Sequence, residues 1–166
     1  VRIEHYIISS GLKEMIEGTE MAKNGAFKKI YASAFMFDDK GVAVWPAQAI
    51  NYTNKTQFLF RIQKGVLDIN DPGVNDYIRP EEQRVPFRNM IYIGDSDTDI
   101  PCMSLVNVNG VYKMMQHHRI RYYAPADYTD GSDLDTVVKQ IIQKTAAYEA
   151  LEQQYVRNKH EAESHR

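Results

Sequence analysis

An acidic loop between two apolar segments, at residues 90–102, constrains the fold of this 166-residue chain more than any other feature. Residues 90–93 are apolar and predict a buried strand that ends at Gly94. Three carboxylates follow at alternate positions, Asp95, Asp97 and Asp99, and the apolar stretch after them predicts a helix. A strand that passes through a short loop into a helix is typical of open α/β sheets, which bind ligands at the carboxyl ends of their strands.

The crowding of these carboxylates has two explanations. Acids this close repel one another unless a cation joins them, and Mg²⁺ is the usual partner, bound through one or two carboxylates with phosphate oxygens and water. Alternatively, Ser96 and Asp99 form the N-cap signature of the following helix, where acids suit the helix dipole. The sequence leaves both explanations open.

The remaining pattern predicts strands that alternate with helices. Together with residues 90–93, strands are expected at 6–8, 29–37, 42–45, 111–112 and 122–124, and helices at 12–17, 53–64, 98–106 and from 134 to about 156. This order favours an α/β fold with a mostly parallel sheet. The turn Asp38-Asp39-Lys40-Gly41 predicts one antiparallel hairpin, which we expect Pro46 to end.

Composition narrows the class of protein. The chain is 43% hydrophobic and 25% charged, which is ordinary for one soluble domain, and its net charge of −2 does not favour nucleic acid as a partner. No segment approaches the roughly 18 apolar residues of a membrane span. The single cysteine, Cys102, suits a reducing compartment, so we expect a cytoplasmic protein without a membrane partner.

Two further segments carry residues suited to anion binding. Ser9, Ser10 and Gly11 come where a strand hands over to a helix, and such a junction either binds an anion or simply caps the helix. Lys55 opens a predicted helix, where a cation opposes the dipole. It is either a solvated side chain or an ammonium placed to meet phosphate oxygens and carboxylates.

These segments resemble, in order, three motifs of the haloacid dehalogenase-like hydrolases, particularly their phosphatase branch. The segments are Ile-Ile-Ser-Ser-Gly, then Asn-Lys-Thr at a helix start, then Tyr-Ile-Gly-Asp-Ser-Asp-Thr-Asp. The resemblance spans roughly residues 3–135 and implies a Rossmann-like, three-layer core, which we expect over residues 1–157, with a polar tail at 158–166. It also implies an Mg²⁺-dependent phosphatase that acts on a phosphorylated small molecule through an aspartyl-phosphate.

The resemblance assigns roles to individual residues. Ser9 would hold a phosphate oxygen, together with the amides near Ser10 and Gly11. Lys55 would neutralise the phosphate and the nucleophile. Asp95 would bind Mg²⁺, and Asp99 would bind it through water or orient Lys55.

One motif of the family, Asp-x-Asp-x-Thr, has no counterpart here. In the family it precedes the serine motif and supplies the nucleophile, but only eight residues precede Ser9. We therefore expect an incomplete core without the first strand and cap, inactive by itself because phosphoryl transfer needs an in-line nucleophile. The alternative is a non-catalytic domain that binds phosphate, metal or protein. Substrate identity and oligomeric state stay open.

Overall fold

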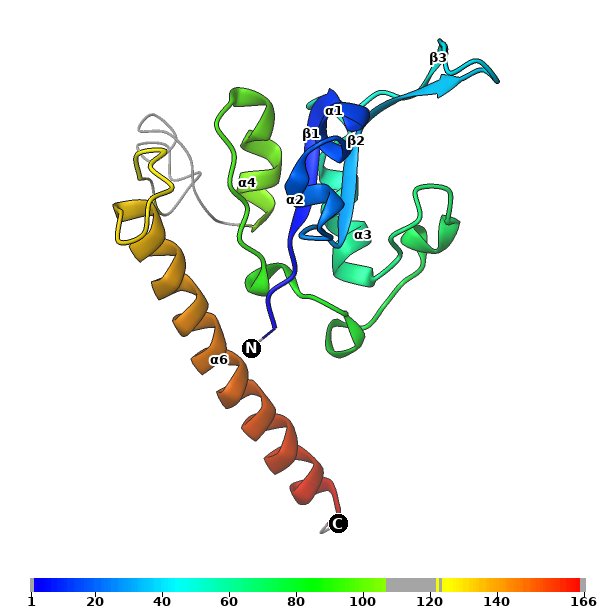
Figure 1. Cartoon of the computed structure of the whole chain (residues 1–166). Helices are drawn as coiled ribbons and strands as arrows, with labels where there is room; N and C mark the ends of the chain where they lie inside the picture. Colours follow the sequence, from blue (N-terminus) through cyan, green and yellow to red (C-terminus); the bar gives the residue numbers. More distant parts are fainter. Residues whose placement is uncertain (1, 107–121, 123, 165–166) are drawn as a thin grey trace.

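The computed structural model describes residues 2–106, 122 and 124–164 (Figure 1). In this part of the chain the strands form one sheet in the order β1 (Tyr6–Leu12), β2 (Lys29–Phe37), β3 (Ala43–Gln48). β1 pairs with β2 in parallel, and β2 pairs with β3 in antiparallel. Two short helices, α1 (Lys13–Glu17) and α2 (Glu20–Lys23), make the crossover from β1 to β2.

The predicted Rossmann-like, mostly parallel three-layer sheet is wrong. The sheet is small and mixed, and a long C-terminal helix accompanies it. Residues 90–93, expected as a strand, contain the buried side chains of Met90 and Tyr92 but form no ladder with any described strand. Met90 and Tyr92 are therefore buried although their backbone pairs with no described strand. The strand expected at 111–112 lies outside the described residues, and neither Tyr122 nor Ala124 is in a strand.

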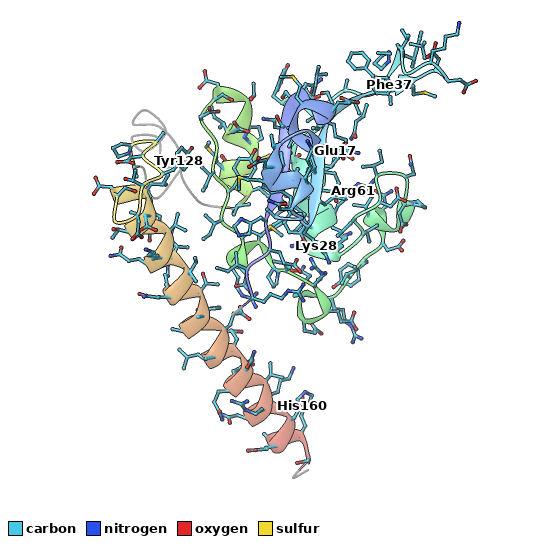
Figure 2. All side chains as sticks on the ribbon, in the orientation of Figure 1. Glu17, Lys28, Phe37, Arg61, Tyr128 and His160 are labelled. Carbon is cyan, nitrogen blue, oxygen red and sulfur yellow. The ribbon has the colours of Figure 1, made fainter. Side chains whose placement is uncertain are left out.

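The predicted hairpin between β2 and β3 is confirmed. Gly41 has φ 77°, the left-handed conformation that its turn requires, and Asp38 Oδ1 accepts hydrogen bonds from the amides of Lys40 and Val42. Pro46 lies inside β3 opposite Phe35 instead of ending the strand. This is tolerated because β3 is an edge strand, whose outer amides need no partner. The outer part of the hairpin projects from the molecule (Figure 2).

The core lies between β2 and two helices, α3 (Thr56–Lys64) and α4 (Ile100–Val106). Tyr31 on β2 stacks on Phe58 of α3, with ring centroids 4.6 Å apart. On α4, Cys102 and Met103 are fully buried. The period of the apolar residues on α3 places one face against this cluster, and Gly65 ends the helix at φ 81°.

A long polar loop, residues 66–89, is fixed by cations that α3 supplies. The Arg61 guanidinium donates to the carbonyl oxygens of Asp68, Ile69 and Asp71 at 2.5–3.1 Å. The loop then runs through three short 3₁₀ turns, η1 (Pro72–Asn75), η2 (Pro80–Glu82) and η3 (Phe87–Asn89). The hydrogen bonds from Arg61 satisfy carbonyl oxygens of this loop that no long helix or strand would otherwise pair.

The last helix, α6 (Asp133–Ser164), continues beyond the predicted end near Val156. Its first half packs beside the body of the molecule, and its second half extends away from it (Figure 1). The contact ends near Arg88, which bonds Glu149 at 2.9 Å and lies 5.7 Å from the ring centroid of Tyr148. Among the described helices, α6 included, none has both the length and the apolar character needed to cross a membrane.

Candidate functional site

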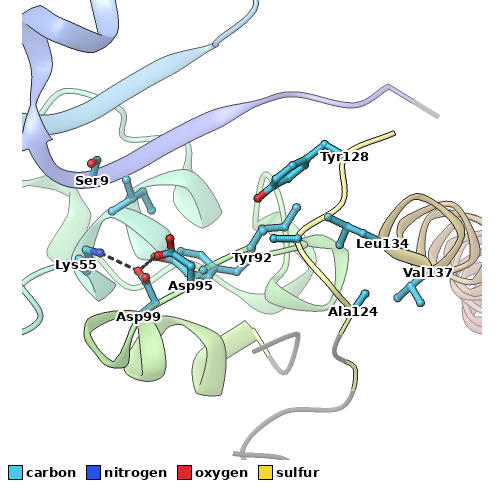
Figure 3. Close-up of a pocket in the computed structure, with 13 residues that line it drawn as sticks. Ser9, Lys55, Tyr92, Asp95, Asp99, Ala124, Tyr128, Leu134 and Val137 are labelled. Carbon is cyan, nitrogen blue, oxygen red and sulfur yellow. Dashed lines mark hydrogen bonds and ion pairs between the residues drawn. The ribbon is translucent and has the colours of Figure 1, made fainter. Parts of the chain in front are cut away.

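A pocket of about 490 Å³ lies between β1, the Gly94 loop and the start of α6 (Figure 3). Its volume is within the range of roughly 300–1,000 Å³ that is usual for small-molecule sites. Polar side chains gather at one end and apolar ones at the other. The lining residues are Ile8, Ser9, Lys55, Tyr92, Ile93, Gly94, Asp95, Asp99, Ala124, Ala126, Tyr128, Leu134 and Val137.

The polar end is built around an ion pair between Lys55 and Asp99. The Lys55 Nζ lies 2.7 Å from Asp99 Oδ1, and the two side chains are only 6% and 7% exposed. Lys55 comes from the residue before α3, and Asp99 from the 3₁₀ turn η4 (Asp97–Asp99) that leads into α4. Lys55 is therefore not a solvated lysine. Its ammonium contacts a carboxylate of the acidic loop, which is one of the two alternatives that the sequence left open.

Three side chains satisfy the carboxylate of Asp99. Oδ1 accepts from Lys55 and from the Tyr92 hydroxyl at 2.6 Å, and Oδ2 accepts from the Ser96 hydroxyl at 2.9 Å. Burial alone would raise the pKa of Asp99, but these hydrogen bonds outweigh it and the pKa is lowered. Burial and the bond to Asp99 raise the pKa of Tyr92, so its hydroxyl keeps its proton and remains a donor.

The helix-cap explanation of the acidic loop fails at the side chain of Ser96. Ser96 occupies the N-cap position of η4, but its hydroxyl makes no capping bond to the backbone. The hydroxyl bonds the carboxylate of Asp99 and lies 2.7 Å from Thr98 Oγ1. The loop is thus organised around the Asp99 carboxylate, and the Ser96 hydroxyl accepts no hydrogen bond from the first backbone amides of η4.

Asp95 is the exposed carboxylate at the pocket, and Asp97 lies outside it. Gly94 allows the loop to close at this point. A Cβ built on Gly94 would lie 2.6 Å from both Asp99 Cβ and Met103 Cε, closer than side chains normally approach. The glycine is therefore required for the close packing that brings Asp95 and Asp99 to the same rim.

Of the predicted anion-binding residues in β1, only Ser9 lines the pocket. Its hydroxyl oxygen accepts from the Gly11 amide at 3.0 Å, which leaves the hydroxyl proton available. The pairing register of β1 shifts between Ser9 and Leu12, so Ser9, Ser10 and Gly11 belong to an irregular strand end and not to a helix start. Ser10 and Gly11 are exposed and outside the pocket lining.

The fit of these residues to Mg²⁺ is partial. Within the described residues no three His, Cys, Asp or Glu side chains converge on one point. Asp99 is committed to its three donors, so it is suited to act through water and not as a direct ligand. Asp95 is open, and one carboxylate with phosphate oxygens and water is a common Mg²⁺ environment. The ion would therefore bind together with a phosphate.

The apolar end of the pocket was not predicted from the sequence. Tyr128 precedes α6, and Leu134 and Val137 lie on its first turns. Their spacing of three residues places them on one face of the helix, but an apolar face of this kind usually predicts packing in the core and not a ligand pocket. Tyr92, too, read as an ordinary strand residue, because nothing in the sequence indicates that its hydroxyl reaches Asp99.

Comparison with known proteins adds little about this site. No protein-family model and no solved structure matches the chain. A protein of Borreliella burgdorferi described as uncharacterized is 25% identical over an alignment of 163 residues. The match covers 80% of this chain and 55% of the relative. The chain thus spans about half the length of the curated relative that it matches.

Proposed function

We propose that the polar end of the pocket binds the phosphate group of a phosphorylated small molecule together with Mg²⁺, as the phosphate site of a phosphomonoester hydrolase. The observation that carries the proposal is the convergence of Ser9, Lys55, Asp95 and Asp99, from separate parts of the sequence, on one pocket. Each has a task there that its contacts allow.

The buried ammonium of Lys55 is the cationic group that the described pocket residues offer to a phosphate. Its Nζ lies 2.7 Å from Asp99 Oδ1 and 3.4 Å from Thr98 Oγ1, so two of its three protons have partners and one is left for a phosphate oxygen. Charge-assisted hydrogen bonds of this kind are about twice as strong as neutral ones. Ser9 can donate its hydroxyl proton to a second oxygen. When bound at Asp95, Mg²⁺ would supply charge neutralisation to the phosphate.

Hydrolysis by the route that the resemblance implies needs a further aspartate. In that route a carboxylate attacks phosphorus, the ester P–O bond breaks, and a general acid gives its proton to the leaving alcohol. Water, losing a proton to the same group, then cleaves the acyl phosphate, which releases phosphate and restores the carboxylate. The missing motif supplies both the nucleophile and this acid in the family. Among the described pocket residues the carboxylates are Asp95 and Asp99, and both have other tasks. We therefore propose that the 166-residue chain binds phosphate without turnover, and that catalysis belongs to a protein that adds the nucleophile to this pocket.

A non-catalytic phosphate-binding domain is the second candidate, favoured because neither carboxylate of the described pocket residues is left to act as the nucleophile once Asp95 binds Mg²⁺ and Asp99 holds Lys55. The two differ in one measurement. A natural protein that contains this chain and hydrolyses p-nitrophenyl phosphate, with loss of activity in Asp95→Asn, supports the enzyme. The same protein binding phosphate with no turnover supports the domain. We place either protein in the cytoplasm, where a free thiol such as Cys102 stays reduced.

Isothermal titration of the chain with inorganic phosphate in the presence of MgCl₂ tests the binding itself. Asp95→Asn and Ser9→Ala should weaken binding. Asp97→Asn and Ser10→Ala are the matched controls, since these residues neighbour the first two but lie outside the pocket. Equal phosphate affinity in all four variants would exclude this pocket as the site.

A further inference from the structure

The pocket continues well beyond the space that a phosphate would occupy. In Figure 3 the polar side chains of Ser9, Lys55 and Asp99 lie at one end, Tyr92 lies between, and Tyr128, Leu134 and Val137 lie at the other end. An inorganic phosphate at the polar end would leave the second half of the cavity to water. The lining of that half therefore carries information about the group attached to the phosphate.

That half of the lining is apolar and carries no charged side chain among the described residues. Figure 3 places Ala124, Leu134 and Val137 there, together with the rings of Tyr92 and Tyr128. The charged lining residues, Lys55, Asp95 and Asp99, are all at the polar end. A charged or strongly hydrated group placed against this wall would lose water without gaining a partner, which is costly.

We infer that the pocket selects a phosphomonoester whose other part is uncharged, apolar and about the size of an aromatic ring. This inference rests on the proposed function, because the phosphate at Lys55 fixes which part of the ligand reaches the apolar wall. Aromatic side chains pack on ring-shaped ligands with particular geometry, and Tyr92 and Tyr128 offer two such surfaces. The hydroxyl of Tyr92 is held by Asp99, so its ring position is fixed by the same network that orients Lys55.

The expected preference can be put as a ratio of affinities. Each fully buried CH₂-sized group improves binding by about fourfold. Only part of a ring would be covered, because Tyr128 is 77% exposed. We expect a phenyl group to improve affinity over a methyl group by about tenfold or more.

The experiment compares inorganic phosphate, methylphosphonate and phenylphosphonate by isothermal titration of the 166-residue chain in the presence of Mg²⁺. Phenylphosphonate should bind about tenfold tighter than methylphosphonate. Tyr128→Ser and Val137→Ser should bring that ratio close to one and leave the affinity for inorganic phosphate unchanged. Val138→Ser is the control, because Val138 neighbours Val137 on α6 and does not line the pocket.

The outcomes separate the two levels of the proposal. Equal affinity for the two phosphonates, with phosphate bound, overturns the inferred selectivity and leaves the phosphate site standing. A preference that both Tyr128→Ser and Val137→Ser retain overturns the assignment to this wall. Tyr128 is so exposed that its replacement does not threaten folding. No binding of any of the three anions overturns the phosphate site and the selectivity with it.

Discussion

Replacing Lys55 by methionine should destabilise the chain strongly, because it leaves Asp99 enclosed without its cation. The two side chains are only 6% and 7% exposed, and their charged atoms are 2.7 Å apart. Removing one partner of such a pair costs about 3–5 kcal/mol. Tyr92 and Ser96 still donate to the carboxylate, so we expect the lower end, about 3 kcal/mol.

For a chain of this size each kcal/mol shifts the melting temperature by about 2–4 °C, so we expect a fall of about 6–12 °C. Circular dichroism at pH 7 measures it. The double variant Lys55→Met with Asp99→Asn should lose less than the two single variants together, because it no longer buries an uncompensated charge. Lys139→Met is the control, since Lys139 pairs with Asp130 and Asp135 at the surface and its loss should leave the melting temperature nearly unchanged. A Lys55→Met chain that melts with the parent would refute the buried pair as a stabilising element.

Three further predictions concern the same core. The pKa of Asp99 is lowered from 3.8 in the folded chain, so the ionised carboxylate stabilises the fold above pH 3.8, and this stabilisation is lost as the pH falls through the folded pKa. The melting temperature of Asp99→Asn should therefore fall less steeply below about pH 4 than that of the parent, and parallel curves would contradict this. Burial raises the pKa of Tyr31 from 10.0 to about 12, so stability should decline as the pH rises from 10 toward 12, and Tyr31→Phe should flatten that decline in denaturant titrations while costing about 1 kcal/mol for the lost bond to the Leu67 carbonyl. Gly94→Ala should cost about 1–3 kcal/mol because its Cβ would meet Asp99 and Met103, whereas Gly18→Ala, with its nearest atom at 3.3 Å, should cost less; equal losses in urea titrations would argue against the close approach.

Local signals in the sequence predicted the hairpin and α3 well. The hairpin followed from the Asp38–Gly41 turn, and α3 followed from the period of its apolar residues and the glycine after it. Each of these depends on residues near one another in the chain. The sheet was predicted less well, because strand pairing depends on a neighbour that the segment itself does not specify.

Residues 90–93 show this difference. The apolar run predicted a buried segment, and Met90 and Tyr92 are buried, whereas Ile93 is exposed. Burial of side chains does not provide a strand whose backbone could pair with this segment. Among the described strands β1 pairs only with β2. The mostly parallel sheet was inferred from this segment together with strands expected at 6–8, 29–37, 111–112 and 122–124. The fold prediction failed because residues 90–93, Tyr122 and Ala124 belong to no strand.

The contact between Lys55 and the acidic loop was easier to predict than the fold, because charge restricts where residues can go. A lysine and an aspartate that both leave water are stable only in contact, and this condition brings Lys55 and Asp99 together across the sequence. The hydroxyls that complete the network, from Tyr92 and Ser96, carry no such restriction and were missed. Ser96 even suggested a helix cap, since the same hydroxyl serves either purpose.

Under the proposed function, the charges at the polar end require phosphate and Mg²⁺ to bind together. One ammonium and two carboxylates give this end a net negative charge before any ligand arrives. A phosphate dianion would add to that repulsion, and Asp95 alone offers Mg²⁺ only one protein ligand. Each ligand therefore supplies what the other lacks, and their binding free energies are linked by the same amount in both directions. Lys55 cannot provide this balance alone, because Asp99 already offsets its charge.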